Sequence, residues 1–149
     1  MDAAMDAARQ ALANGDVPVG AVVIDAEGVV IGRGFNTREA EHDPTGHAEV
    51  VALREAGRSL GSWHLDGCAL VVTLEPCTMC AGAAVLARVA TVVFAAWDPK
   101  AGAVGSLWDV VRDRRLNHRP EVVSGIREQQ SRDLLTTFFS TLREPPDVF

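Results

Sequence analysis

The stretch TLEPCTMCAGA, residues 73–83, contains two of the three cysteines in the chain, Cys77 and Cys80. It overlaps CALVVT (68–73), a short valine-rich apolar run that predicts a buried strand. Pro76 is typical of the first turn of a helix, so residues 76–89 are predicted to be helical. The segment therefore predicts a strand followed directly by a helix, with both cysteines near the helix N-terminus.

The rest of the chain also alternates strands and helices. The predicted elements are a helix (2–13), a β-hairpin (19–25 and 28–34), a loop (34–46), a helix (47–57), the strand and helix already named, a strand (91–96), a loop (97–106), a short helix (107–113), a strand (121–125) and an amphipathic helix (126–143). This order predicts an α/β fold, a three-layer α/β/α sandwich with a mixed central sheet of about five strands. Because no linker or internal repeat divides the chain, residues 1–149 are predicted to form one domain.

Composition and charge exclude several classes of protein. Hydrophobic residues make up 48% and charged residues 23% of the 149, as in ordinary globular proteins. The net charge of −6 argues against a basic surface for nonspecific nucleic-acid binding. The N-terminus does not have the pattern of a signal peptide, and no apolar run is long enough to span a bilayer. An odd number of cysteines in a chain without an export signal predicts a reducing, cytoplasmic compartment and no disulfide framework.

The spacing of Cys77 and Cys80 alone leaves several functions open. Residues three apart lie on one face of a helix, and the helix dipole favours thiolates near its N-terminus, which suits a redox dithiol as well as a metal site. A second cluster, HDPTGHAEV (42–50), also begins a predicted helix and supplies His47 and Glu49. These two side chains can share a site only if His47 lies at an irregular first turn, since each helical residue turns by about 100°.

One histidine and two cysteines suit a catalytic zinc site. A structural zinc would need a fourth protein ligand, whereas three ligands leave one position for water, whose pKa zinc lowers toward about 7. Glu49 can take a proton from that water and deliver it to a leaving amine. From the residues alone, the prediction is a zinc hydrolase that acts on an amino-substituted heterocycle.

The order of these motifs carries a family resemblance. H-x-E followed by P-C-x-x-C is similar to the signature of zinc-dependent base deaminases. Over nearly its whole length the chain resembles the bacterial tRNA adenosine deaminases, which have the cytidine-deaminase-like fold. The matching motifs are VPVGAVV (17–23), GRGFN (32–36), HDPTGHAE (42–49), TLEPCTMCAGA (73–83), VVFAAWDPKAGAVGSLWDV (92–110) and NHR (117–119).

The resemblance implies a function and a set of site residues. The reaction is hydrolysis of the wobble adenosine of a tRNA anticodon to inosine, with release of ammonia. The implied assembly is a homodimer with one zinc per subunit, whose partner is the tRNA anticodon stem-loop, and neither DNA nor a membrane is expected as a partner. The implied residues are the zinc ligands His47, Cys77 and Cys80, the proton shuttle Glu49, and the substrate-binding residues Asn36, Ala48, Asp98 and Lys100.

Because the net charge is negative, we also expect a few localised cations to hold the tRNA backbone. The candidates are Lys100, Arg112, Arg114, Arg115, Arg119 and Arg143.

Three alternative functions remain open. A deaminase of free bases or nucleosides, such as guanine or cytosine, would use the same metal site. A non-catalytic zinc-stabilised interaction module would need a fourth protein ligand, and a redox dithiol protein would form a reversible disulfide between Cys77 and Cys80.

Overall fold

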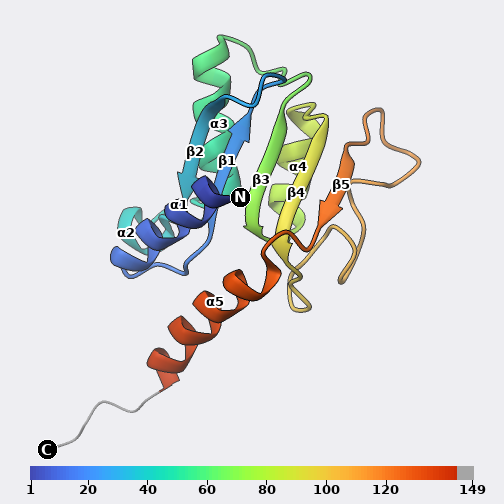
Figure 1. Cartoon of the computed structure of the whole chain (residues 1–149). Helices are drawn as coiled ribbons and strands as arrows, with labels where there is room; N and C mark the ends of the chain where they lie inside the picture. Colours follow the sequence, from blue (N-terminus) through green and yellow to red (C-terminus); the bar gives the residue numbers. More distant parts are fainter. Residues whose placement is uncertain (144–149) are drawn as a thin grey trace, which may run out of the picture.

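The computed structural model describes residues 1–143, and its helices and strands follow the predicted order except for an additional short helix, α2, and the absence of the helix predicted over 107–113 (Figure 1). The elements are α1 (Asp2–Ala13), β1 (Gly20–Ile24), β2 (Val30–Phe35), α2 (Arg38–Glu41), α3 (Ala48–Leu60), β3 (Ala69–Leu74), α4 (Thr78–Leu86), β4 (Thr91–Ala96), β5 (Glu121–Ser124) and α5 (Glu128–Arg143). The five strands form one sheet in the order β2-β1-β3-β4-β5. β1 pairs antiparallel with β2 and β3, whereas β4 pairs parallel with β3 and β5. The predicted mixed sheet is confirmed.

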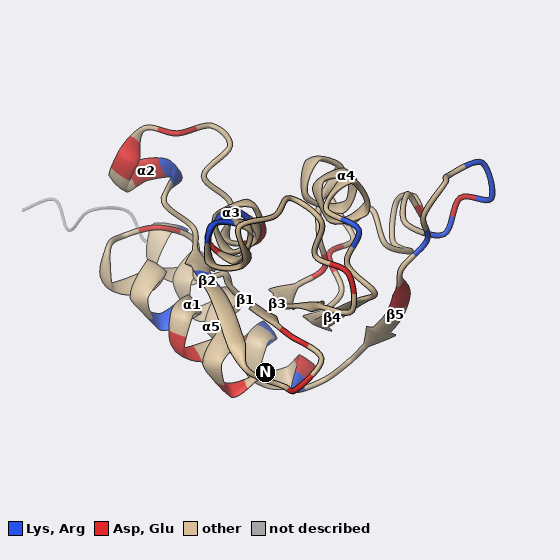
Figure 2. Cartoon of the chain, turned by 90° about the horizontal axis from the view of Figure 1, so that it is seen from above, with Lys and Arg blue, Asp and Glu red and all other residues tan. Residues whose placement is uncertain are grey.

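Helices cover both faces of this sheet, α3 and α4 on one face and α1 and α5 on the other (Figure 2). Successive side chains of a strand point to opposite faces, and the two cores follow that alternation. Val23 and Val72 belong to the larger core beneath α3 and α4. Their neighbours Val22 and Val71 pack with Ala4 of α1 in the smaller core. The predicted three-layer sandwich is therefore confirmed.

A glycine holds the start of α3 against β2. A Cβ atom on Gly34 would lie 2.2 Å from the carbonyl oxygen of Ala48 and 2.6 Å from the backbone nitrogen of Ala52, closer than real Cβ atoms approach. Only glycine therefore allows the helix backbone to lie on the strand at this point. The contact fixes the first turn of α3, which carries Glu49 directly after His47.

The loop predicted over 34–46 contains the short helix α2. Two backbone N–H groups in its first turn, those of Glu39 and Ala40, donate to the carboxylate of Asp16 at 3.0 and 3.2 Å. This carboxylate satisfies amides that have no partner within the helix. It comes from the segment after α1, which is why the sequence around residue 38 gave no helix signal of its own.

The short helix predicted over 107–113 does not form, and that prediction is wrong. The backbone N–H of Val110 donates to the carbonyl of Ala103 at 2.9 Å, and Val104 forms an isolated antiparallel bridge with Asp109. The chain thus folds back on its own preceding turn, so its amides are not available for helical bonds. Within residues 1–143, no helix is both long and apolar enough to cross a membrane.

Candidate active site

The N-termini of α3 and α4 meet near one end of the sheet and bring the histidine and the two cysteines together. His47 is the N-cap of α3, with φ −82° and ψ 147°, and Cys77 is the N-cap of α4, with φ −71° and ψ 176°. Both have the extended backbone that is usual at an N-cap. Cys80 lies one turn into α4 and is fully buried. The irregular geometry that the spacing of His47 and Glu49 required is therefore present.

The three candidate ligands have the separations that a tetrahedral zinc site needs. Nδ1 of His47 lies 3.6 Å from Sγ of Cys77 and 3.5 Å from Sγ of Cys80. Zinc bonds of about 2.3 Å to sulfur and about 2.0–2.1 Å to nitrogen, at a tetrahedral angle, place those atoms about 3.6 Å apart. All three ligand atoms lie within 4.8 Å of one another. His47, Cys77 and Cys80 thus form a candidate zinc site.

The thiols are electrostatically unequal. The pKa of Cys77 is lowered to about 4 because Cys80 and then His47 hydrogen bond to its thiolate. The pKa of Cys80 is raised because it hydrogen bonds to Cys77 and is buried. The hydrogen bond with Cys77 raises the pKa of His47. Cys77 is therefore the more acidic of the two thiols, and a cation that binds both sulfurs must displace the proton of Cys80.

Glu49 is a buried acid beside this cluster. Only 4% of its surface is exposed, and burial raises the pKa of its carboxyl from 4.5 to about 7. The charge of Cys77 raises that pKa further, whereas Cys80 lowers it through a side-chain hydrogen bond. A carboxyl group with a pKa near 7 can both accept and release a proton at neutral pH.

A pocket of about 400 Å³ opens onto Glu49, His47 and Cys77. Asn36, Asp98 and Lys100 also line it, so the structure brings six of the eight predicted site residues to one cavity. Cys80 and Ala48 are buried and do not line its wall. A volume of a few hundred Å³ is usual for a small-molecule pocket.

Asn36 connects the pocket wall to the start of α3. Its Oδ1 accepts a hydrogen bond from the backbone N–H of Ala48 at 3.1 Å, and the side chain is only 8% exposed. The first helical amide is thus satisfied by Asn36, which leaves the side-chain NH2 group as a donor. The structure therefore places Ala48 as the backbone partner of Asn36.

The pocket also contains residues that were not predicted from the sequence. Trp97 and Phe139 line it and are 36% and 43% exposed, while Arg38 contributes a cation from α2. The buried acid Glu75 also forms part of the wall. Phe139 belongs to the amphipathic helix α5, and its apolar spacing indicates burial without indicating which surface it covers. Trp97 could have been found from its position directly before Asp98, within the motif VVFAAWDPKAGAVGSLWDV (92–110).

Of the predicted basic residues within the described part of the chain, Lys100 alone lines the pocket. His118, beside Arg119, hydrogen bonds through Nε2 to the carbonyl of Val89, which precedes β4. The pocket residues 97–101 follow β4, so residues 118–119 and the pocket lie at opposite ends of that strand (Figure 1), whereas Arg112 donates from Nη2 to the carbonyl of Val104 at 3.2 Å, in the loop after β4. The cations that line the pocket are Lys100 and Arg38.

Comparison with known proteins agrees with this geometry. Residues 1–96 match the family model for the cytidine and deoxycytidylate deaminase zinc-binding region. The chain is 46% identical to the tRNA-specific adenosine deaminase of Bacillus subtilis over 144 residues, which cover 97% of this chain and 89% of that protein.

Solved structures give the same fold. A structure of a tRNA:A34 deaminase, which carries out A-to-I editing at the wobble position, superimposes with a TM-score of 0.86 at 41% identity and covers 91% of this chain and 97% of its own. The guanine deaminase of Nitrosomonas europaea superimposes with a TM-score of 0.77 at 26% identity, covering 92% and 81%. The resemblance predicted from the sequence is confirmed. The chain belongs to the tRNA-specific adenosine deaminases, within the cytidine and deoxycytidylate deaminase zinc-binding family.

Proposed function

We propose that this protein, as one deaminase domain over residues 1–149, hydrolyses the wobble adenosine of a tRNA anticodon to inosine and releases ammonia. The observation that carries the proposal is the buried carboxyl of Glu49, which lies on the wall of a pocket next to a three-residue zinc site. The family relatives supply the substrate class. A tRNA loop suits such a pocket because single-stranded bases can be splayed out and bound individually.

In this proposal, different residues bind the metal and transfer the proton. His47 Nδ1 and the sulfurs of Cys77 and Cys80 would hold the zinc, one ion per subunit. When bound, zinc supplies the Lewis acidity that makes hydroxide available near neutral pH. Glu49 takes a proton from the attacking water and delivers it to N6 of adenine. A C6–O bond forms, the C6–N6 bond breaks, and ammonia leaves.

Asn36, Asp98 and Lys100 position the nucleotide in this proposal. The NH2 group of Asn36 donates to a ring acceptor of the base, because its Oδ1 is already occupied by Ala48. Asp98 and Lys100 are far from Asn36 in the sequence, in the loop after β4, but they line the same pocket. They meet the sugar and phosphate of the nucleotide.

Deamination of a tRNA anticodon stem-loop transcript tests the function. Glu49→Ala should retain zinc but lose at least about 10²-fold in turnover, the usual contribution of a positioned acid–base group. Glu27→Ala, which changes an exposed acid in the turn between β1 and β2, is the control and should behave like the unmodified protein. Robust activity on free guanine, with none on the stem-loop, would assign the protein to the free-base deaminases.

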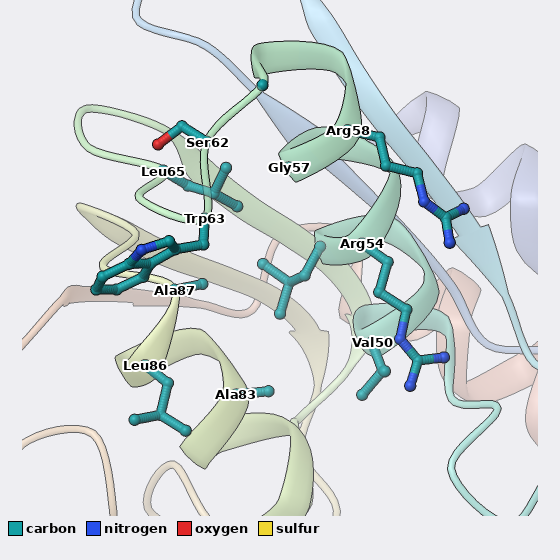
Figure 3. A pocket seen from close by; sticks show the side chains of 12 residues that line it. Val50, Arg54, Gly57, Arg58, Ser62, Trp63, Leu65, Ala83, Leu86 and Ala87 are labelled. Carbon is teal, nitrogen blue, oxygen red and sulfur yellow. The ribbon is translucent and has the colours of Figure 1, made fainter.

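We propose further that two copies assemble through an apolar groove between α3 and α4. The groove has a volume of about 680 Å³, and Trp63 and Leu86 at its edge are 65% and 74% exposed (Figure 3). A contiguous exposed apolar patch rimmed by polar residues is typical of an interaction site, and Arg54 and Arg58 lie on the exposed side of α3 beside the groove. A symmetric dimer would bury this face of both copies.

The molar mass in solution tests the assembly. Leu86→Glu places a charge in the groove and should convert a dimer of the unmodified protein into a monomer in light-scattering measurements. Leu12→Glu, on α1 at the other face, is the control and should remain dimeric. A monomeric unmodified protein would refute the interface.

We place the reaction in the cytoplasm, where tRNA and reduced thiolates coexist.

A further inference from the structure

Glu75 is a buried acid that the proposed reaction does not use. It follows β3 and precedes Pro76, and only 2% of its surface is exposed. No lysine or arginine of residues 1–143 forms an ion pair with it. A buried carboxylate is costly unless other groups satisfy its oxygens, so its hydrogen bonds indicate what it does.

The backbone of the loop after β4 satisfies this carboxylate. Oε2 accepts from the backbone N–H of Asp98 at 2.8 Å and from the hydroxyl of Ser106. Oε1 accepts from the backbone N–H of Val104 at 3.0 Å and from that of Ser106 at 2.9 Å. Each oxygen therefore binds two donors, and the four bonds join the two ends of the segment 98–106.

The same loop is also held against the candidate zinc ligand Cys77. The backbone N–H of Ala103 donates to the carbonyl of Pro76 at 2.9 Å, and Gly102 forms an antiparallel bridge with Cys77. A Cβ atom on Gly102 would lie 2.2 Å from Oε2 of Glu75, so a larger residue would displace the carboxylate. Glu75 thus lies between the loop and the segment that presents Cys77.

The 98–106 loop carries Asp98 and Lys100, the two predicted substrate-binding residues that line the pocket from this loop. Oδ1 of Asp98 accepts from the backbone N–H groups of Lys100 and Ala101 at 3.0 and 3.3 Å, which shapes the turn. We propose that Glu75 is a positioning residue, whose carboxylate holds the 98–106 loop so that Asp98 and Lys100 face the substrate nucleotide. This inference rests on the proposed tRNA substrate, and it names a residue of the pocket wall that acts on binding through the loop, since its carboxylate oxygens are occupied by donors of that loop.

Glu75→Gln tests the proposal because it keeps the size of the side chain and changes the hydrogen-bonding pattern. A carboxamide has one accepting oxygen and one donating NH2 group. In either orientation, at least one backbone N–H of the loop faces the NH2 group and loses its acceptor. The buried amide that loses its partner favours opening of the loop.

Lys100 gives a direct readout of loop opening because it is the only lysine in the sequence. A lysine-specific endopeptidase can cut the chain only after this residue, and cleavage follows the population of the open loop. Glu75→Gln should speed cleavage at least about tenfold, the factor for one lost hydrogen bond to a charged group. Ser106→Ala, which removes one of the four bonds, should speed it less.

Two controls separate loop opening from general destabilisation. Val23→Ala creates a cavity in the core and lowers the melting temperature, but it leaves the bonds of Glu75 in place. Glu121→Gln neutralises an exposed acid on β5. Both should be cleaved at the rate of the unmodified protein. If Val23→Ala accelerates cleavage as much as Glu75→Gln does, global unfolding explains the result and the proposal is wrong.

The kinetics on a tRNA anticodon stem-loop complete the test. Glu75→Gln should retain its zinc and raise KM at least about fivefold with kcat within about twofold, the pattern for lost ground-state binding. Unchanged cleavage, or faster cleavage without a change in KM, would overturn the positioning role. If the unmodified protein is inactive on tRNA, the proposed function is wrong. The cleavage assay would still report whether Glu75 holds the loop.

Discussion

Burial of Glu49 should make the stability of the metal-free protein fall as the pH rises toward neutrality. Burial raises the pKa of this carboxyl from 4.5 to about 7. Between those pH values the folded protein holds a proton that the unfolded chain has released, so the free energy of unfolding decreases with rising pH. Each pH unit corresponds to about 1.4 kcal/mol, and the whole interval therefore to about 3 kcal/mol.

Glu49→Gln removes this titration while preserving the shape of the side chain. In urea denaturation of chelator-treated protein, the original chain should lose about 3 kcal/mol more than the variant between pH 4.5 and pH 7.5. Titrating groups that lie away from Glu49 occur in both proteins and cancel in the difference. Parallel stability curves for the two proteins would refute the reasoning, since they would mean that burial does not raise the pKa of Glu49.

Three further substitutions test the metal site, the packing of α3 and the pocket cations. Cys80→Ala should abolish stoichiometric zinc in metal analysis, because two protein ligands seldom retain the ion; full occupancy would remove Cys80 from the site. Gly34→Ala should lower the free energy of unfolding by about 1–3 kcal/mol and weaken zinc binding. Gly82→Ala is the control, because a Cβ at Gly82 meets nothing within 4 Å. It should leave zinc binding unchanged and either preserve or raise the free energy of unfolding. Lys100→Ala should lower the slope of log affinity for tRNA against log salt by about 0.7–0.9 if Lys100 contacts one phosphate; an unchanged slope would exclude that contact.

Local sequence patterns predicted most of the elements because strand and helix signals are themselves local. The run TVVFAA (91–96) coincides with β4, and the helix over 2–13 with α1. The order of the strands depends on pairing between distant segments, and the patterns did not predict it. The same holds for α2, whose N–H groups are satisfied by Asp16 from more than 20 residues away.

The candidate site could be predicted in part for a similar reason. Two short motifs supplied His47, Glu49 and the cysteines, since the chemistry of zinc and the spacing within one helical turn limit the choice of residues. The family resemblance also supplied Asp98 and Lys100 of the loop after β4, but no pattern predicted that α5 lines the same pocket. Neither the contribution of Phe139 nor the distance of Arg119 from the pocket follows from the sequence. The roles of the individual residues stay predictions.

The single lysine also determines how this protein can be labelled. Lys100 is exposed and lines the pocket, and the other primary amine of the chain is the N-terminus. Amine-reactive dyes, biotin esters and activated resins would therefore attach either at residue 1 or at the rim of the pocket. In a preparation coupled at Lys100, the pocket would face the support and would be closed to its substrate. For surface-immobilised binding measurements, a terminal affinity tag is the attachment that leaves the pocket open.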